Sequence, residues 1–238
     1  MMISTPSLAK LLLLAKEPLC NTMYVWGGGW NEADTGAGLE ARSLDVSPAW
    51  ASFASKQDAS YDYNNTRFQI HDGLDCSGFI GWLIYNLLET ENGREGYVFP
   101  ACKVAFELAG RGFGTFTPAG DVTDWQPGDI LSSSEHVWLS LGMCEDGSVV
   151  LLHATPPGVI LSGTKLPEGN KKSQAEELAA RYMKKYYPKW YERFPKHSRE
   201  YKCLLESGRL RWSEDVLSDA EGLRKLPADE VLAWLFEE

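Results

Sequence analysis

Gly73-Leu74-Asp75-Cys76-Ser77-Gly78-Phe79 is the stretch that decides the fold, because a helical pattern begins inside it. The apolar positions after the cysteine recur three or four residues apart, as in a buried helix: Phe79, Ile80, Leu83, Ile84 and Leu87. Asp75 occupies the position of an N-cap residue, so Cys76 is predicted in the first helical turn. A helix N-terminus and a nearby imidazolium both stabilise a thiolate. We therefore interpret Cys76 as a candidate nucleophile with a lowered pKa.

Downstream of the cysteine, four short segments have the residue pattern of strands. They follow the turn sequence WQPGD at residues 125–129 and cover residues 130–131, 136–143, 148–154 and 159–161. Short turn sequences join them, which predicts an antiparallel meander placed after the helix. The expected fold class is therefore α+β.

A catalytic cysteine also needs a base, and the sequence holds four histidines: His71, His136, His153 and His197. If the loop around residues 145–146 contains an even number of residues, His136 and His153 share one face of the sheet. One imidazole can then act as the base while the other orients it. A three-residue loop would place them on opposite faces. We assign no role to His71, and His197 is expected at the surface.

The cysteine pattern points away from a disulfide framework and from a zinc site. The five cysteines are odd in number and widely spaced, without a C-x-x-C pair. A reducing compartment suits this pattern, and we expect neither a metal nor another cofactor. The four cysteines other than Cys76 are interpreted as packing residues.

The bulk properties indicate one main domain without a membrane span. The 238 residues are 44% hydrophobic, and no apolar run approaches the roughly 18 residues that a membrane span needs. A net charge of -10 argues against a nucleic-acid partner. Because the first 20 residues lack the pattern of a secretory signal, a cytoplasmic location is expected, with secretion or wall association as the alternative.

Two regions extend the predicted core. Residues 31–72 read as a long irregular insertion, which its aromatic residues are expected to order. Residues 165–238 read as a helical C-terminal extension, and residues 165–211 hold 13 of the 23 Lys and Arg. We interpret these basic residues as a solvated helical surface rather than a specific anion site. The predicted organisation is a catalytic domain at residues 1–164 with the extension at 165–238 packed on it.

Five motifs, in order, resemble the NlpC/P60 family of cell-wall cysteine peptidases: YVWGG at 24–28, GLDCSGF at 73–79, WQPGDI at 125–130, HVWLSLG at 136–142 and LHA at 152–154. The resemblance covers about half of the chain, in residues 6–30 and 70–164. It implies a papain-like core in which the helix carrying the nucleophile packs on a small antiparallel sheet. The insertion and the C-terminal extension have no counterpart in the family's minimal domain.

The resemblance also implies roles for individual residues. Cys76, His136 and His153 would be the catalytic residues, with Cys76 as nucleophile, His136 as base and His153 as its orienting partner. The implied substrate contacts are Tyr24 beside the nucleophile, Asp75 and Ser77 at the free amino end of a peptide, and Trp26 in the groove. Three further tryptophans are weighed as groove residues against the commoner core position: Trp30, Trp50 and Trp125.

By this resemblance the expected activity is that of a cysteine peptidase acting on bacterial cell-wall peptides. The bond would lie near a γ-D-glutamyl linkage to a diamino acid, and the partner would be a peptide rather than nucleic acid or membrane. Two alternatives stay open. The same fold could serve an acyltransferase or a lipid amide or ester hydrolase, or it could be a non-catalytic binding module.

Overall fold

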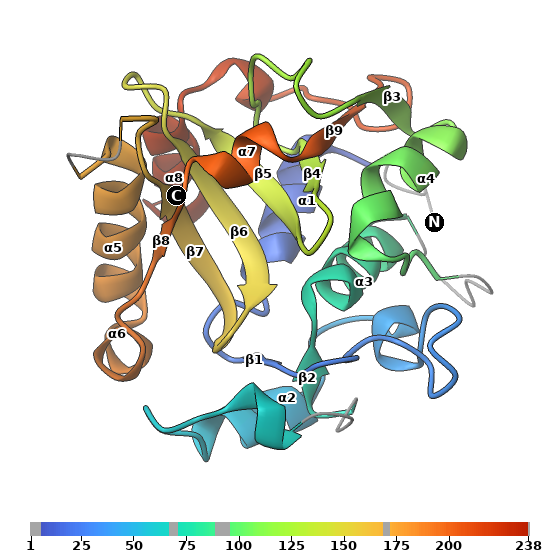
Figure 1. Cartoon of the computed structure of the whole chain (residues 1–238), viewed down its shortest axis with the longest axis vertical. Helices are drawn as coiled ribbons and strands as arrows, with labels where there is room; N and C mark the ends of the chain where they lie inside the picture. The colour runs from blue at the N-terminus through green and yellow to red at the C-terminus, as the bar shows by residue number, and fades with distance from the viewer. Residues whose placement is uncertain (1–5, 67–70, 89–95, 169–171, 238) are drawn as a thin grey trace.

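A mixed sheet organises the structure, a computed structural model that describes residues 6–66, 71–88, 96–168 and 172–237. Within these residues the sheet has nine strands in the order β2-β1-β7-β6-β5-β4-β9-β3, and β8 pairs with β7 (Figure 1). The strands are β1 (Met23–Tyr24), β2 (Gly73–Leu74), β3 (Gly114–Thr117), β4 (Ile130–Ser132), β5 (Val137–Met143), β6 (Val149–Thr155), β7 (Gly158–Thr164), β8 (Ser198–Arg199) and β9 (Gly208–Trp212).

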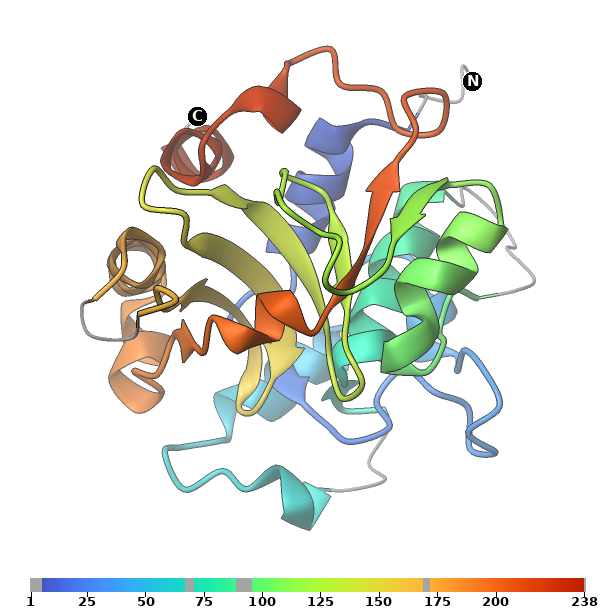
Figure 2. The same cartoon turned by 45° about the horizontal axis from the view of Figure 1, so that its top comes forward.

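Helices cover both faces of this sheet. They are α1 (Leu8–Lys16), α2 (Pro48–Ser55), α3 (Cys76–Leu88), α4 (Val104–Gly110), α5 (Gln174–Tyr186), α6 (Pro188–Arg193), α7 (Lys202–Leu205) and α8 (Ala228–Glu237). Helix α3 packs on β5 and β6, whereas α7 crosses the opposite face (Figures 1 and 2). The fold class is α+β, as the sequence predicts. No helix in the described ranges is long and apolar enough to cross a membrane.

The predicted helix at the cysteine and the predicted meander are both present. The Asp75 Oδ1 atom accepts a hydrogen bond of 2.7 Å from the Gly78 amide, which is the N-cap contact expected for α3. Every residue of α3 from Cys76 to Leu87 is buried, because the helix lies between the sheet and the N-terminal segments. Strands β4, β5, β6 and β7 pair antiparallel in chain order.

The insertion is more regular than the sequence indicates. It contains α2, two short 3-10 turns and a parallel pair between β1 and β2 that brings its two ends together. Trp50 of α2 is fully buried against Trp82 of α3, with ring centroids 6.1 Å apart. Aromatic burial therefore orders this segment, as expected, but through a helix. Residues 67–70 lie outside the described residues.

Two predictions are wrong. The sheet is neither small nor entirely antiparallel, and the C-terminal extension is not entirely helical. The extension supplies β8, which runs parallel to β7, and β9, which lies between β4 and β3 (Figures 1 and 2). The basic residues of β9 hid its strand character. Leu210 is fully buried, while Arg209 and Arg211 on either side bind carboxylates instead of facing water.

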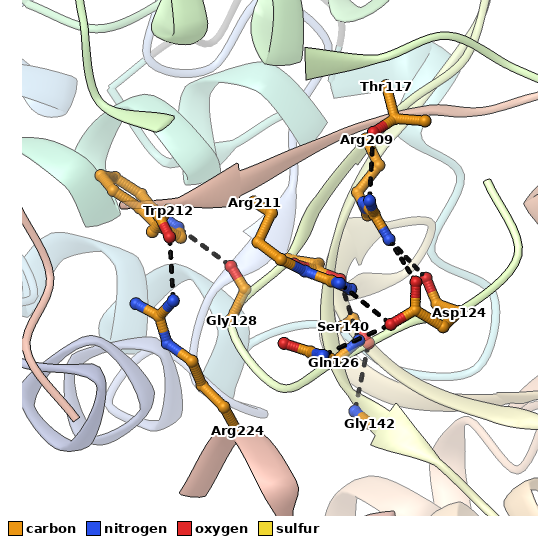
Figure 3. Close-up of polar contacts among 11 residues, drawn as sticks. Thr117, Asp124, Gln126, Gly128, Ser140, Gly142, Arg209, Arg211, Trp212 and Arg224 are labelled. Carbon is orange, nitrogen blue, oxygen red and sulfur yellow. Dashed lines mark hydrogen bonds and ion pairs between the residues drawn. The ribbon is translucent and has the colours of Figure 1, made fainter. Parts of the chain in front are cut away.

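Those two arginines fasten β9 to the turn that precedes β4. Arg211 bridges both carboxylates of the turn, with Nη2 2.6 Å from Asp129 and Nη1 2.9 Å from Asp124. Arg209 Nη1 lies 2.7 Å from Asp124 (Figure 3). We call these four residues the Arg–Asp network. It joins the C-terminal extension to the WQPGD turn, and the Asp129 amide in turn donates to the Gln126 carbonyl at 3.1 Å.

Candidate active site

Two glycine-containing segments fix the position of Cys76: residues 27–29, which follow β1, and the start of α3. The Asp75 amide donates to the Gly28 carbonyl at 2.9 Å. A Cβ atom added to Gly78 would lie 1.9 Å from the same carbonyl oxygen, so only glycine permits this approach. The glycines of both motifs thus hold the first turn of α3 against residues 24–29.

Cys76 lines a cavity of about 270 Å³ at this point. Tyr24, Trp26 and Trp30 contribute aromatic side chains to its wall. Three carboxylate residues, Asp34, Asp75 and Glu135, also line it, and no Lys or Arg of the described residues does. The cavity therefore presents a thiol, aromatic surface and negative charge together.

A chain of hydrogen bonds orders the floor of the cavity. Trp30 Nε1 donates to Ser77 Oγ at 3.0 Å, and Ser77 Oγ donates to Asp75 Oδ1 at 3.0 Å. Burial raises the pKa of Asp75 to about 6, although hydrogen bonds from Gly78 and Ser77 oppose the rise. Asp75 can thus change charge near neutral pH.

The two predicted histidines meet in the structure. His136 Nε2 lies 2.7 Å from His153 Nδ1, and His153 Nε2 lies 2.9 Å from Ser162 Oγ on β7. His153 is completely buried, and Trp138 lies beside both rings with centroids 4.3 and 5.6 Å away. Because Nε2 of His136 is occupied, its Nδ1 is the atom left to act as a base.

The loop between β5 and β6 has three residues. The sequence alone predicts that a loop of this length places His136 and His153 on opposite faces of the sheet. The Cys144 amide donates to the Ser148 carbonyl at 2.7 Å, which leaves residues 145–147 in the loop. The register then shifts between Ser140 and Met143, where Gly142 has a φ of 107°. This one-residue bulge cancels the effect of the odd loop and returns both histidines to one face.

The electrostatics of the thiol differ from the expectation. Burial raises the pKa of Cys76 to about 12, and the Asp75 carboxylate acts in the same direction. Backbone amides of Val137 and Ser77 lower it by a smaller amount. The predicted lowering of this pKa is therefore wrong for the resting structure, because the helix terminus is enclosed and carries an acid at its N-cap.

The imidazoles are also neutral at rest. Burial lowers the pKa of His136 to about 3 and holds that of His153 well below its usual value. The charge of Arg199, on β8, acts in the same direction on both rings. Among the described residues no hydrogen bond joins Cys76 Sγ to His136, so the thiol and base do not form a resting ion pair.

Tyr24 lies beside the thiol, where the resemblance places it. It is 6% exposed, and burial followed by the neighbouring Cys76 raises its pKa far above the usual value. The insertion covers it from outside. Tyr63 packs edge-on at 5.4 Å, and the Tyr61 hydroxyl donates to the Tyr24 carbonyl at 2.6 Å. The phenol is therefore neutral, and Tyr24 lines the same cavity as Cys76.

The remaining tryptophans and histidines occupy different environments. Trp26 is 45% exposed at the cavity, whereas Trp50 and Trp125 belong to the two hydrophobic cores. His71 is exposed and bonded to Glu40. His197 is buried rather than at the surface, because it lies beneath Tyr191 and donates from Nδ1 to the Leu161 carbonyl.

Sequence reasoning missed several residues of this site. Ser162 and Arg199 carry no motif signal, because each reaches the histidines only through strand pairing of β7 and β8. Asp34 and Glu135 reach the cavity from loops. Ser162 lies two residues after Ile160, which pairs with His153, so Ser162 and His153 share a face of the sheet. This placement depends on the register of β6 and β7, which the sequence does not reveal.

The chemistry that this arrangement allows is nucleophilic attack by a thiol with an imidazole base. In the described residues no group of three or more His, Cys, Asp or Glu side chains is placed to hold a metal ion. No family model, curated protein or solved structure matches this chain.

Proposed function

We propose that this protein is a cysteine peptidase that hydrolyses an amide bond in bacterial cell-wall peptides, near a γ-D-glutamyl linkage to a diamino acid. The observation that carries the proposal is the 2.7 Å contact between His136 and His153 at the strand beside α3, whose first residue is Cys76. The resemblance to the NlpC/P60 motifs supplies the substrate class and a papain-like core.

In the proposed reaction the Cys76 sulfur attacks the amide carbonyl while His136 Nδ1 takes its proton. His153 holds the other nitrogen of His136, and the base then protonates the leaving amine. Water attacks the resulting thioester and releases the acid. Because the resting thiol and imidazole are both neutral, proton transfer accompanies attack rather than preceding it.

Two features support a short peptide with a free amino end. Asp75 and Ser77 lie in the wall of the cavity next to Cys76, and the remaining acids of the wall, Asp34 and Glu135, also favour a cation. The Tyr24 hydroxyl and the Cys76 amide are candidate donors to the oxyanion. The cavity volume of about 270 Å³ suits a few residues of substrate rather than a folded protein.

The test is mass spectrometry of defined tri- and tetrapeptide stems after incubation with the wild type and with Cys76→Ala. Wild type is expected to cut the stem at the γ-D-glutamyl bond, and Cys76→Ala is expected to leave it intact. Cys144→Ala is the matched control, because Cys144 is also buried and is a separate residue of the β5–β6 connection. Identical products from wild type and Cys76→Ala would refute the assignment of the nucleophile.

The acyl-transfer alternative has weaker support from the cavities. A larger cavity of about 490 Å³ lies between α2 and α6 and is lined by Cys20, Ala54 and Trp190 among others, but none of the candidate site residues lines it. Release of a fatty acid from a lipid amide or ester, with no cut in a wall peptide, would favour that alternative. Iodoacetamide labelling of Cys76 no faster than of the other thiols would favour a binding module.

A further inference from the structure

Arg199 is a cation in an enclosed position beside the histidine pair. Its Nη2 donates to the Thr155 hydroxyl at 2.6 Å, and its Nε is fully buried without a hydrogen-bond partner. The residue as a whole stays partly exposed. Arg199 comes from β8, whose position beside β7 brings the C-terminal extension to the site.

Arg199 has no carboxylate partner among the described residues, although the chain carries a net charge of -10. The arginines of the Arg–Asp network, by contrast, all bind aspartates. A buried cation without an anion is costly, because desolvation is not offset by an ion pair. The Arg199 guanidinium therefore lacks the counter-charge that would offset its desolvation.

The position of Arg199 connects it to the chemistry. Thr155, which holds its Nη2, lies two residues after His153 on β6 and shares a face with it. The Arg199 charge disfavours protonation of His153 and of His136. The other titratable groups facing this cluster are His197, which is neutral at rest, and Cys203, whose pKa burial raises to about 12. Neither supplies a counter-charge.

We propose that Arg199 and the Thr155 hydroxyl form the receptor for a carboxylate group of the substrate, and that occupancy of this receptor activates the histidine base. An anion bound there offsets the guanidinium charge at both imidazoles. His136 Nδ1 then accepts the Cys76 proton more readily, because the imidazolium that forms no longer faces an unopposed cation. This inference rests on the proposed function for its substrate, but activation can be measured on the thiol alone.

The experiment measures the rate at which neutral iodoacetamide alkylates Cys76, by peptide mapping, in succinate and in chloride of equal ionic strength. In the wild type, succinate is expected to raise the rate about threefold or more, because the carboxylate offsets a cation that acts on the base. Arg199→Gln is expected to react faster than wild type in chloride and to show no response to succinate. Arg181→Gln, an exposed arginine of α5, is the matched control and is expected to respond as wild type does.

Two results would overturn the proposal. One is an equal rate for the wild type in succinate and chloride, which decides the matter whether or not the variant folds. The other is an unchanged succinate response in Arg199→Gln. Thr155→Val is a second probe that keeps the charge and removes the hydroxyl, and a weaker succinate response is expected from it. If stem peptides stay uncut while succinate activates Cys76, the proposed function fails and the carboxylate receptor stands.

Discussion

The candidate active site and the Arg–Asp network are both polar clusters enclosed by strands, but they treat charge in opposite ways. In the network, two arginines meet two aspartates in contacts of 2.6 to 2.9 Å. Figure 3 shows both arginines beside Asp124. In the active site, burial keeps the thiol and both imidazoles neutral, and Asp75 is pushed towards its neutral form.

The difference separates a stabilising cluster from a reactive one. Charges that are paired and hydrogen-bonded on folding fasten β9 to its turn. Against the effect of burial, Arg211 and Arg209 hold the pKa of Asp124 below its usual value, whereas burial raises the pKa of Asp129. Groups that are buried without a counter-charge lose their charge, and they regain it only when a proton moves or a ligand binds. We expect substitutions in the network to change stability and substitutions at the site to change reactivity.

The largest effect on stability is expected from Arg211→Met. The change leaves the Asp129 side chain, which is 2% exposed, without its bidentate partner, and should lower the free energy of unfolding by about 3 kcal/mol. Urea denaturation measures it. Lys202→Met is the control, because its exposed pair with Glu206 is worth at most about 0.5 kcal/mol. If Arg211→Met lowers the free energy of unfolding no more than Lys202→Met does, the Arg–Asp network does not stabilise the fold and the comparison with the active site fails.

The next effect is the pH dependence of stability that Asp75 causes. Its sign is opposite to that of a salt-bridged acid. Its folded pKa of about 6 lies above the usual 3.8, so the folded state binds the proton more tightly and stability from this group falls as pH rises from about 4 to about 6. The charged form above that range should cost up to about 3 kcal/mol. Asp75→Asn keeps an N-cap side chain and removes the titration.

Asp75→Asn should therefore be more stable than wild type at pH 7 and lose that advantage near pH 4. Urea denaturation at both pH values measures the difference. The same variant should alkylate faster at Cys76, because the Asp75 charge raises the pKa of the thiol. A constant stability difference across this pH range would show that the Asp75 carboxyl titrates as an exposed acid.

The smallest effect is expected from Ser162→Ala. It leaves the fully buried Nε2 of His153 without a partner, which should cost about 1 to 2 kcal/mol of stability. It should also slow iodoacetamide labelling of Cys76, because His153 no longer holds His136. Ser148→Ala is the control, because it removes a buried hydroxyl that binds the Ala175 amide at the end of β6 opposite His153. Equal labelling rates in the two variants would remove Ser162 from the site.

Local rules made several elements predictable from the sequence. The spacing of apolar residues after Cys76, with Asp75 at the cap, predicted α3 because both signals act within one helical turn. The meander followed from short alternating segments and turn residues. The insertion and the C-terminal extension were less predictable, because α2 and β9 are stabilised by partners far away in the chain.

The sequence by itself determined which groups could react, namely Cys76 and two strand histidines, because residue type and motif order are local properties. Only the tertiary structure decided their state. A bulge at Gly142 returned His136 and His153 to one face, and enclosure raised the thiol pKa where a helix terminus alone would lower it. Register and burial depend on every strand and helix packed around the site, including β8 with Arg199, so the charge of these groups is a property of the whole fold.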